Sequence, residues 1–160
     1  MDYNQFKAWF EQNYAQLALP QDCTEIQRTT ELPGSAVIWT FRWCLKFADG
    51  KYLQIKEHYT KQSGLLDSRR SHFTYHYGPI VREQPDGIPE GSHEDPVDIR
   101  IDTSGGSVHM HHGASEPHYG QDRVDGLDML KLDMFKFVGA VLKHRASGKL
   151  IKNTFGFKVK

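Results

Sequence analysis

The sequence predicts an α+β fold in which an antiparallel sheet of about five or six strands is accompanied by an N-terminal helix and a long C-terminal helix. Two observations lead to this class. Apolar residues recur every three or four positions near both ends of the chain, a spacing typical of amphipathic helices. Between these segments apolar and polar residues alternate, which is typical of half-buried strands. At 160 residues the chain has the length of one domain, and we expect 1–160 to form a single one.

The beginning of the chain predicts a helix over residues 1–18. Asp2 is available as its N-cap, and Pro20 lies just beyond its last apolar residue. The apolar stripe of this helix consists of Tyr3, Phe6, Phe10, Tyr14 and Leu17. After the helix, we expect the sheet to occupy residues 35–112.

A long β-hairpin is predicted around Asp49-Gly50, because alternation runs up to this turn-forming pair and resumes after it. A three-residue loop over 48–50, with Gly50 in the left-handed conformation, would place Trp43 opposite Ile55 and both apolar rows on one face. That register puts Arg42, Lys46, Lys56 and His58 on the other face and leaves Glu57 on the apolar one. A two-residue turn would instead set Arg42 opposite Glu57, and the sequence leaves both turns open.

Three further strands are predicted from alternation over residues 69–77, 97–102 and 107–112. The segment 78–96 contains four of the seven prolines and many acidic residues, which predicts an irregular, exposed loop.

The second helix is predicted over residues 125–147. Asp125 is its expected N-cap, apolar residues follow at helical spacing, and Gly148 is placed to end it. The basic tail, 148–160, alternates only in part, so it predicts either a last strand or an extended arm.

The charges of the chain sum to zero but are segregated along it. Residues 35–82 carry eight basic and three acidic side chains, and residues 127–160 carry eight basic and two acidic ones. Residues 83–126 carry two basic and ten acidic side chains. A net charge of zero argues against a uniformly basic surface for binding nucleic acid. The segregation of the charges along the chain still permits a local anion-binding surface.

The expected compartment is the cytoplasm. Cys23 and Cys44 lie far apart and suggest neither a disulfide framework nor a thiolate zinc site. The first residues lack the basic start and the apolar run that are typical of a signal peptide. Nowhere does the sequence contain the run of about 18 apolar residues that a membrane-spanning helix needs. We therefore expect neither secretion nor membrane insertion.

Histidines and charged residues mark a candidate site on one face of the sheet. Six of the nine histidines lie within two stretches of the chain, namely His72, His76, His109, His111, His112 and His118. If the apolar rows face the helices, strand parity gathers imidazoles, a guanidinium and a carboxylate that suit general acid/base chemistry and anion stabilisation. The candidate catalytic residues are His76, Arg100, Asp102, His109 and His111. The candidate substrate contacts are Lys56, His58, Tyr75, His112 and His118.

Two other hypotheses stay open. His109 and His111, with Glu116 after a turn, would offer two imidazoles and a carboxylate to a transition metal, and this spacing resembles the first cupin motif. The glycines of that motif and its second half are missing, so we expect no bound metal or cofactor. In the other hypothesis the polar face belongs to a binding module for a protein or nucleic acid, and its histidines only pack and hydrogen-bond.

The order of these features resembles the TumE-like toxins of bacterial and archaeal toxin–antitoxin pairs. The resemblance runs from about Val37 to Phe137, from the hairpin to the second helix. Its parts are the hairpin with Lys56-Glu57, then Tyr75-His76-Tyr77, then Arg100-Ile101-Asp102, and then His109-Met110-His111-His112-Gly113. The chain departs from the family pattern in having no proline before the histidine cluster and in spacing the histidines differently.

The resemblance implies a toxin that stops growth by cutting RNA and is held inactive by a cognate antitoxin with a helix-turn-helix domain. In this interpretation His76 or His109 takes the proton from a ribose 2′-OH, and His111 protonates the leaving 5′-oxygen. Arg100 and Lys56 would stabilise the charged phosphorane without a metal. Asp102 would orient an imidazole or Arg100.

Overall fold

The computed structural model describes residues 2–34, 37–61, 72–91, 95–103, 109–112, 121–122 and 132–155. These residues form the predicted α+β class of fold, with two α-helices, a seven-stranded antiparallel sheet and a small two-stranded sheet. In chain order the elements are α1 (Tyr3–Tyr14), β1 (Cys23–Glu31), β2 (Trp39–Phe47), β3 (Lys51–Tyr59), β4 (Phe73–Pro79), β5 (Arg82–Glu83), β6 (Pro89–Glu90), β7 (Ile99–Asp102), β8 (His109–His112), β9 (Gln121–Asp122), α2 (Met134–Ser147) and the 3₁₀ helix η2 (Ile151–Thr154).

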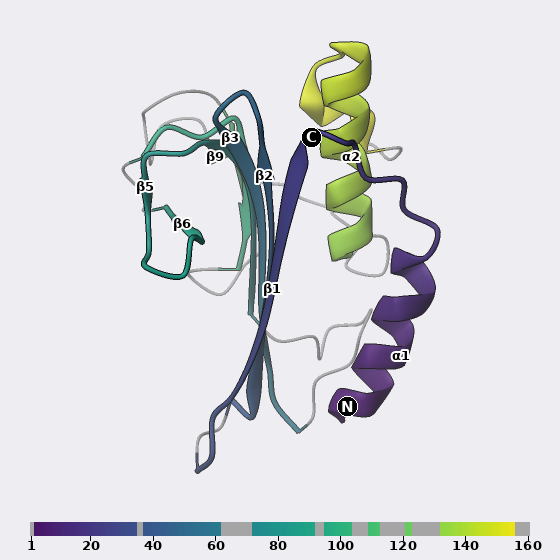
Figure 1. Ribbon diagram of the computed structural model, residues 1–160, viewed down its shortest axis with the longest axis vertical. Coiled ribbons are helices and arrows are strands. Elements are labelled where there is room, and N and C mark those ends of the chain that lie inside the picture. Colours follow the sequence, from purple (N-terminus) through teal and green to yellow (C-terminus); the bar gives the residue numbers. More distant parts are fainter. Residues whose placement is uncertain are drawn as a thin grey trace.

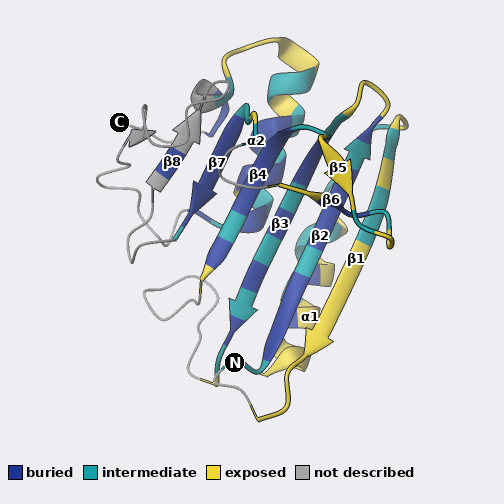
Figure 2. Cartoon of the chain, turned by 90° about the vertical axis from the view of Figure 1, so that its left-hand side faces the viewer, coloured by how far each residue is buried: buried dark blue, intermediate teal, exposed yellow. Residues whose placement is uncertain are grey.

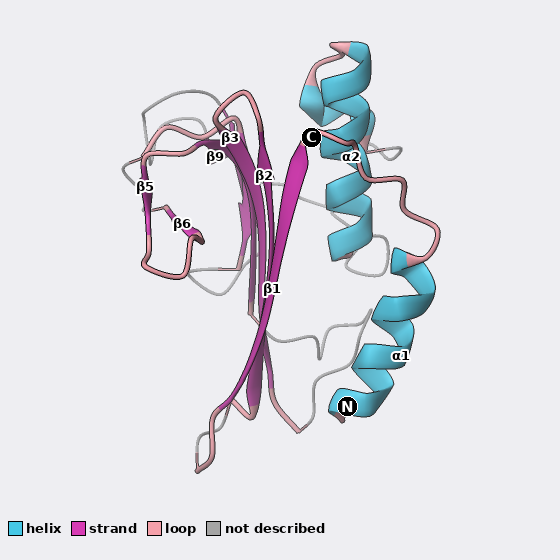
Figure 3. Cartoon of the chain, viewed as in Figure 1, coloured by secondary structure: helices cyan, strands magenta, loops and turns pink. Residues whose placement is uncertain are grey.

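The elements stack in three layers (Figures 1 and 3). Both α-helices cover one face of the large sheet, here called the helix face. The β5–β6 hairpin lies over the opposite face, here called the hairpin face. The main core lies between helices and sheet and includes Phe6 of α1 and Phe137 of α2. A smaller apolar cluster of Cys44, Tyr52 and Ile88 holds the hairpin against its face.

The strand order in the large sheet is β1-β2-β3-β4-β7-β8-β9, with every neighbouring pair antiparallel. The predicted hairpin register is confirmed, since Trp43 lies opposite Ile55 and Arg42 opposite Lys56. Gly50 has φ +86°, and its N–H donates to the Phe47 carbonyl at 3.2 Å, as the three-residue loop requires. This register leaves Glu57 on the helix face.

The predicted N-terminal helix is confirmed as α1. Asp2 caps it reciprocally with Gln5: the Gln5 N–H donates to Asp2 Oδ1 at 2.8 Å, and the Asp2 N–H donates to Gln5 Oε1 at 3.1 Å. Phe6 and Phe10 of α1 are buried against the helix face. Capping and an apolar stripe thus place the helix start and its inner side where the sequence predicts them.

Replacing Asp2 with alanine is expected to lower the free energy of unfolding by about 1 kcal/mol, because the Gln5 N–H loses its acceptor. Urea unfolding followed by circular dichroism measures the loss. Asp2→Asn keeps a side-chain oxygen and is expected to lose only a few tenths of that amount. An equal loss in the two variants would contradict the capping role.

Strand β1 lies where the sequence analysis expected no element, so the sheet begins at Cys23 rather than at residue 35. It pairs with β2 along its whole length, from Cys23 opposite Phe47 to Glu31 opposite Trp39. Most of its residues are exposed because it is an edge strand, and Figure 2 shows it mostly in the colour of exposed residues. Its polar sequence therefore has no alternating row of apolar side chains from which the strand could be predicted.

The second helix begins later than predicted, which corrects its N-cap from Asp125 to Asp133. The Lys136 N–H donates to Asp133 Oδ1 at 2.8 Å, and α2 starts at Met134. Residues 125–131 lie outside the described residues. The predicted end is confirmed, because Gly148 follows the helix with φ +71° and its N–H donates to the His144 carbonyl. Asp125, like Asp133, precedes apolar residues at helical spacing, so periodicity alone did not identify the start.

The tail is neither a strand nor an extended arm over residues 151–154, where it forms η2. The Thr154 hydroxyl donates to the carbonyls of Ala140 and Ile151, at 2.8 and 2.6 Å, and Phe155 is buried in the main core. Residues 156–160 of the basic tail lie outside the described residues. Within the described residues no helix is both long and apolar enough to cross a bilayer.

The segment expected to be an irregular, exposed loop instead contains the β5–β6 hairpin. Ile88 and Pro89 are buried, and Gly87 supplies a positive φ of +83° in its turn. Lys46 of β2 forms an ion pair with Glu83 and donates to the Gly87 carbonyl at 3.3 Å. Prolines and acids suggested exposure, but one buried isoleucine and these polar contacts fix the segment to the sheet.

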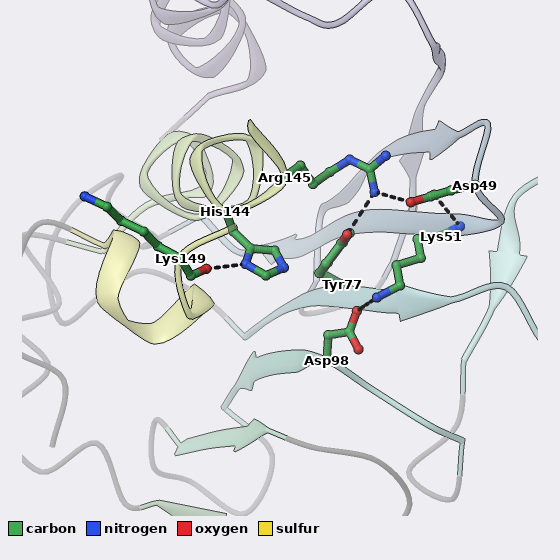
Figure 4. Close-up of polar contacts among 7 residues, drawn as sticks. All are labelled: Asp49, Lys51, Tyr77, Asp98, His144, Arg145 and Lys149. Atoms are coloured by element: carbon green, nitrogen blue, oxygen red, sulfur yellow. Dashed lines mark hydrogen bonds and ion pairs between the residues drawn. The ribbon is translucent and has the colours of Figure 1, made fainter. Parts of the chain in front are cut away.

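The end of α2 is tied to the turn between β2 and β3 (Figure 4). Arg145 Nη1 donates to Asp49 Oδ2 and to the Tyr77 hydroxyl, both at 2.9 Å. Its guanidinium lies over the Phe47 ring, 3.8 Å from the centroid. One partly buried side chain therefore links α2 to β2, β4 and the hairpin turn.

Candidate functional site

A polar cavity of about 290 Å³ lies on the hairpin face of the sheet. Its floor comes from β2, β3, β4 and β7. In these strands the residues on the hairpin face alternate with the core residues on the helix face. One wall comes from residues 84–91 of the β5–β6 hairpin, here called the hairpin segment. Figure 2 shows β5 and β6 lying across the sheet. The lining residues are Arg42, Gln54, Lys56, Thr74, His76, Gln84, Pro89, Glu90, Gly91, Arg100 and Asp102.

Strand register brings the predicted catalytic residues of β4 and β7 together. His76 pairs with Arg100 and Thr74 with Asp102. In an antiparallel sheet directly paired residues point to the same face, so all four line the cavity. His76 and Asp102 are each only 2% exposed, and Arg100 is 7% exposed. The expectation that parity gathers these three residues is therefore confirmed by their positions.

His76 is a buried, neutral imidazole. Burial, together with the neighbouring Arg100 charge, lowers the pKa of His76 to about 3. Within the described residues neither ring nitrogen has a hydrogen-bond partner, and the ring stacks on Tyr52 with centroids 4.9 Å apart. At neutral pH one ring nitrogen is therefore a lone-pair acceptor and the other a donor, and no described residue uses either.

Two further cations come from the hairpin β2–β3. Lys56 is half-buried, and burial together with Arg42 lowers the pKa of its ammonium. Arg42 donates from Nη1 and Nη2 to Gln84 Oε1 at 3.4 and 3.3 Å. The described lining thus carries three cationic side chains and two carboxylates, which leaves one net positive charge inside a confined space.

Gly91 brings the hairpin segment unusually close to the buried imidazole. A Cβ at this position would lie 2.7 Å from the Tyr52 hydroxyl, 3.6 Å from His76 Cε1 and 3.7 Å from Arg100 Nη2. Tyr52 is itself buried, and burial raises the pKa of its phenol to about 12. The glycine therefore allows the backbone to pack on the tyrosine that supports His76.

Gly91→Ala is expected to lower the free energy of unfolding by about 1–3 kcal/mol, because the new methyl group must displace Tyr52 or the hairpin. Urea unfolding measures the change. The matched control is Gly139→Ala in α2, where a Cβ meets nothing within 4 Å. Helix propensity predicts a gain of up to about 1 kcal/mol there. A gain at both positions would show that Gly91 is not needed for close approach.

Two predicted substrate contacts lie away from the cavity lining. Tyr75 lies on the helix face, fully buried, and its hydroxyl donates to the carboxylate of Glu57, as does the hydroxyl of Tyr59. It is therefore a core residue, which corrects its assignment as a substrate contact. His58 shares the hairpin face with Lys56, but its Nδ1 is 2.9 Å from the Thr40 hydroxyl oxygen, and it does not line the cavity.

The histidines of β8 are placed by register alone. His111 pairs with Arg100, His109 with Asp102 and His112 with Ile99. Their side chains lie outside what the structure describes, as do the whole of residues Glu116 and His118. The described residues contain no group of three or more metal-ligating side chains. The metal hypothesis, which needs His109, His111 and Glu116, stays a hypothesis.

Several cavity residues were not among the predicted site residues. Alternation had placed Arg42 beside Lys56, and the same parity puts Gln54 and Thr74 on that face. This parity was a signal that could have found all three. Gln84 and Glu90 come from the hairpin segment, whose position over the sheet has no sequence signature. Their role in lining the cavity is visible only in the folded chain.

No protein-family model matches this chain, and neither a curated protein nor a solved structure is significantly similar to it. The resemblance to TumE-like toxins therefore stays a prediction from the sequence.

Proposed function

We propose that the protein is the toxin of a toxin–antitoxin pair and that it cleaves RNA at the hairpin-face cavity without needing a metal. The observation that carries the proposal is the position of a neutral imidazole, His76, in a cavity that three cations and Asp102 also line. This combination offers a proton acceptor and positive charge in one confined place. Phosphodiester transfer requires both.

In the proposed reaction His76 accepts the proton of a ribose 2′-OH, and the 2′-oxygen attacks the adjacent phosphorus. Arg100 and Lys56 stabilise the negative charge that develops on the phosphorane oxygens. The bond from phosphorus to the 5′-oxygen then breaks, and a second histidine protonates that oxygen. The register of β8 against β7 favours His109 or His111 for this second role. The products are a 2′,3′-cyclic phosphate and a 5′-OH.

Burial lowers the pKa of His76 most, and the Arg100 charge lowers it further because it disfavours a second positive charge nearby. A phosphodiester bound beside Arg100 would add a negative charge, and it would raise the pKa of His76 toward neutrality. Substrate binding would thereby strengthen the base at the moment it is needed.

The direct test is cleavage of RNA by purified protein in buffer containing a chelator. We expect fragments that end in 2′,3′-cyclic phosphate, and we expect His76→Gln to reduce the rate by about 10²–10⁴-fold. The matched control is His144→Gln, which removes a partly buried histidine at the end of α2, in the helix layer on the opposite side of the sheet. The proposal fails if wild type leaves RNA intact or if His76→Gln cleaves at the wild-type rate.

The biological part of the proposal is tested separately by expression. Induced wild-type protein should arrest growth, and co-expression of a helix-turn-helix protein encoded beside it should relieve the arrest. His76→Gln should not arrest growth. Arrest that persists in His76→Gln would place the toxicity outside this cavity.

A second candidate function is a binding module for nucleic acid or another anionic partner. The observation that favours it is the same buried imidazole. With a pKa near 3, His76 is a weak base unless a bound anion raises that pKa. Tight RNA binding by wild type without cyclic-phosphate products would support the module over the nuclease.

A further inference from the structure

We propose that the cavity takes single-stranded RNA, one nucleotide at a time, and excludes RNA duplexes. This inference rests on the proposed function, since it specifies the substrate of the same site. It follows from the depth of the reacting groups, the fixed wall over them and the charge around them.

The groups proposed to react lie too deep for a duplex to reach them. His76 is 2% exposed and Arg100 is 7% exposed, so a phosphodiester must enter the cavity to contact either. The volume of about 290 Å³ lies at the lower end of the range for small-molecule pockets. A base-paired strand holds its phosphates and sugars on a wide, stiff helix. An unpaired nucleotide can splay away from its neighbours.

The wall over the cavity is fastened to the sheet. Ile88 is fully buried in the cluster on the hairpin face, and Lys46 of β2 pairs with Glu83. Arg42 donates to Gln84 at the cavity itself. Admitting a duplex would require lifting this segment, which would expose Ile88 and break these contacts. A single nucleotide requires no such opening.

The charge and polarity of the lining match one nucleotide. Among the described lining residues, three cations against two carboxylates leave one positive charge, which complements the single negative charge of a phosphodiester. Proteins that hold duplexes neutralise many phosphates over a broad surface instead. The amides of Gln54 and Gln84 and the hydroxyl of Thr74 add hydrogen-bond donors and acceptors. Such groups suit the edges of an unpaired base or a ribose hydroxyl.

The experiment compares one RNA sequence as a single strand, as a full duplex and as a hairpin with an unpaired loop. Cleavage is expected in the single strand and within the loop, and the duplex is expected to be cut at least about tenfold more slowly. Equal cleavage of single strand and duplex would overturn the inference and leave the proposed nuclease function intact.

A binding measurement separates the two failures. Fluorescein-labelled 2′-fluoro RNA of the same sequence lacks the attacking hydroxyl, so fluorescence anisotropy reports binding alone. The single strand is expected to bind at least about tenfold more tightly than the duplex. If RNA is never cleaved but this preference holds, the nuclease function fails and the inference stands for a binding site. Equal affinities, or no binding of either, would overturn the inference.

A substitution that fills the cavity tests whether the preference for single-stranded RNA arises at this site. Thr74→Trp places a large ring among the lining residues and is expected to weaken single-strand binding about tenfold. Thr24→Trp, on the exposed part of β1, is the matched control and is expected to leave the affinity unchanged. Circular dichroism shows whether each variant folds. If a folded Thr74→Trp protein binds like wild type, RNA does not enter the cavity. Should Thr74→Trp not fold, the smaller Thr74→Leu replaces it with the same criterion.

Discussion

Replacing Trp43 with alanine is expected to lower the free energy of unfolding by about 3–5 kcal/mol, the range for removing a large aromatic side chain from a packed core. Trp43 is fully buried on the helix face. Its ring contacts Phe10 of α1 and Phe135 of α2 at centroid distances of 5.1 and 5.6 Å. Its Nε1 donates to Glu25 of β1 at 2.9 Å. One substitution therefore weakens the attachment of both helices and of the edge strand.

Urea unfolding followed by circular dichroism measures the effect, and Trp43→Phe is the informative comparison. Phenylalanine keeps most of the ring packing but cannot donate to Glu25. Because Tyr14 still donates to that carboxylate at 2.9 Å, the expected loss for Trp43→Phe is only about 1–2 kcal/mol. A Trp43→Ala loss below that of Trp43→Phe would show that packing at this position is not central to the fold.

Acid is expected to destabilise the protein through His76 by roughly 4 kcal/mol between pH 6.5 and pH 3. The pKa of His76 is lowered from 6.5 to about 3 in the folded state, because burial and Arg100 disfavour its charged form. Below pH 6.5 the unfolded chain therefore binds a proton that the folded protein does not bind. Stability is complete above pH 6.5 and falls as the pH falls, until protonation of the folded state near pH 3 ends the decline.

The comparison with His76→Gln isolates this contribution from carboxylates that titrate in the same range. The free energy of unfolding is measured by urea titration at intervals from pH 7 to pH 4. Between pH 7 and pH 4 wild type is expected to lose on average about 1 kcal/mol more per pH unit than the variant, since each unit of pKa difference corresponds to ~1.4 kcal/mol and the full slope is reached only below pH 6.5. Parallel pH profiles for the two proteins would contradict a neutral, buried His76.

The β2–β3 hairpin shows how much local pattern can predict. Alternation on both sides of Asp49-Gly50, with one apolar row per strand, favours the register that places Trp43 opposite Ile55 over the one that a two-residue turn would give, and the favoured register is observed. The same parity argument gathered His76, Arg100 and Asp102. It works because the side-chain period of a strand is two, whatever the strand pairs with.

Elements without a strong apolar pattern were not predicted. The edge strand β1 contains a single aliphatic residue, Ile26, and its stability comes from pairing with β2. The start of α2 was placed too early because helical spacing extends upstream of Asp133. The N-cap is decided instead by which carboxylate meets a free backbone N–H. Both errors arise where pairing or capping, rather than burial of an apolar row, selects the structure.

The sequence by itself determined the fold class and the face on which His76, Arg100 and Asp102 lie, and its apolar rows favoured the observed register of the β2–β3 hairpin, because each depends on a local period of two or of three to four. Only the tertiary structure decided that these residues form the floor of a cavity, that Tyr75 belongs to the core with Glu57, and that Gln84, Glu90 and Gly91 close the site. The physical reason is that the hairpin segment is held over the sheet by long-range contacts. The burial of Ile88 and the bond between Arg42 and Gln84 join residues that no local pattern relates.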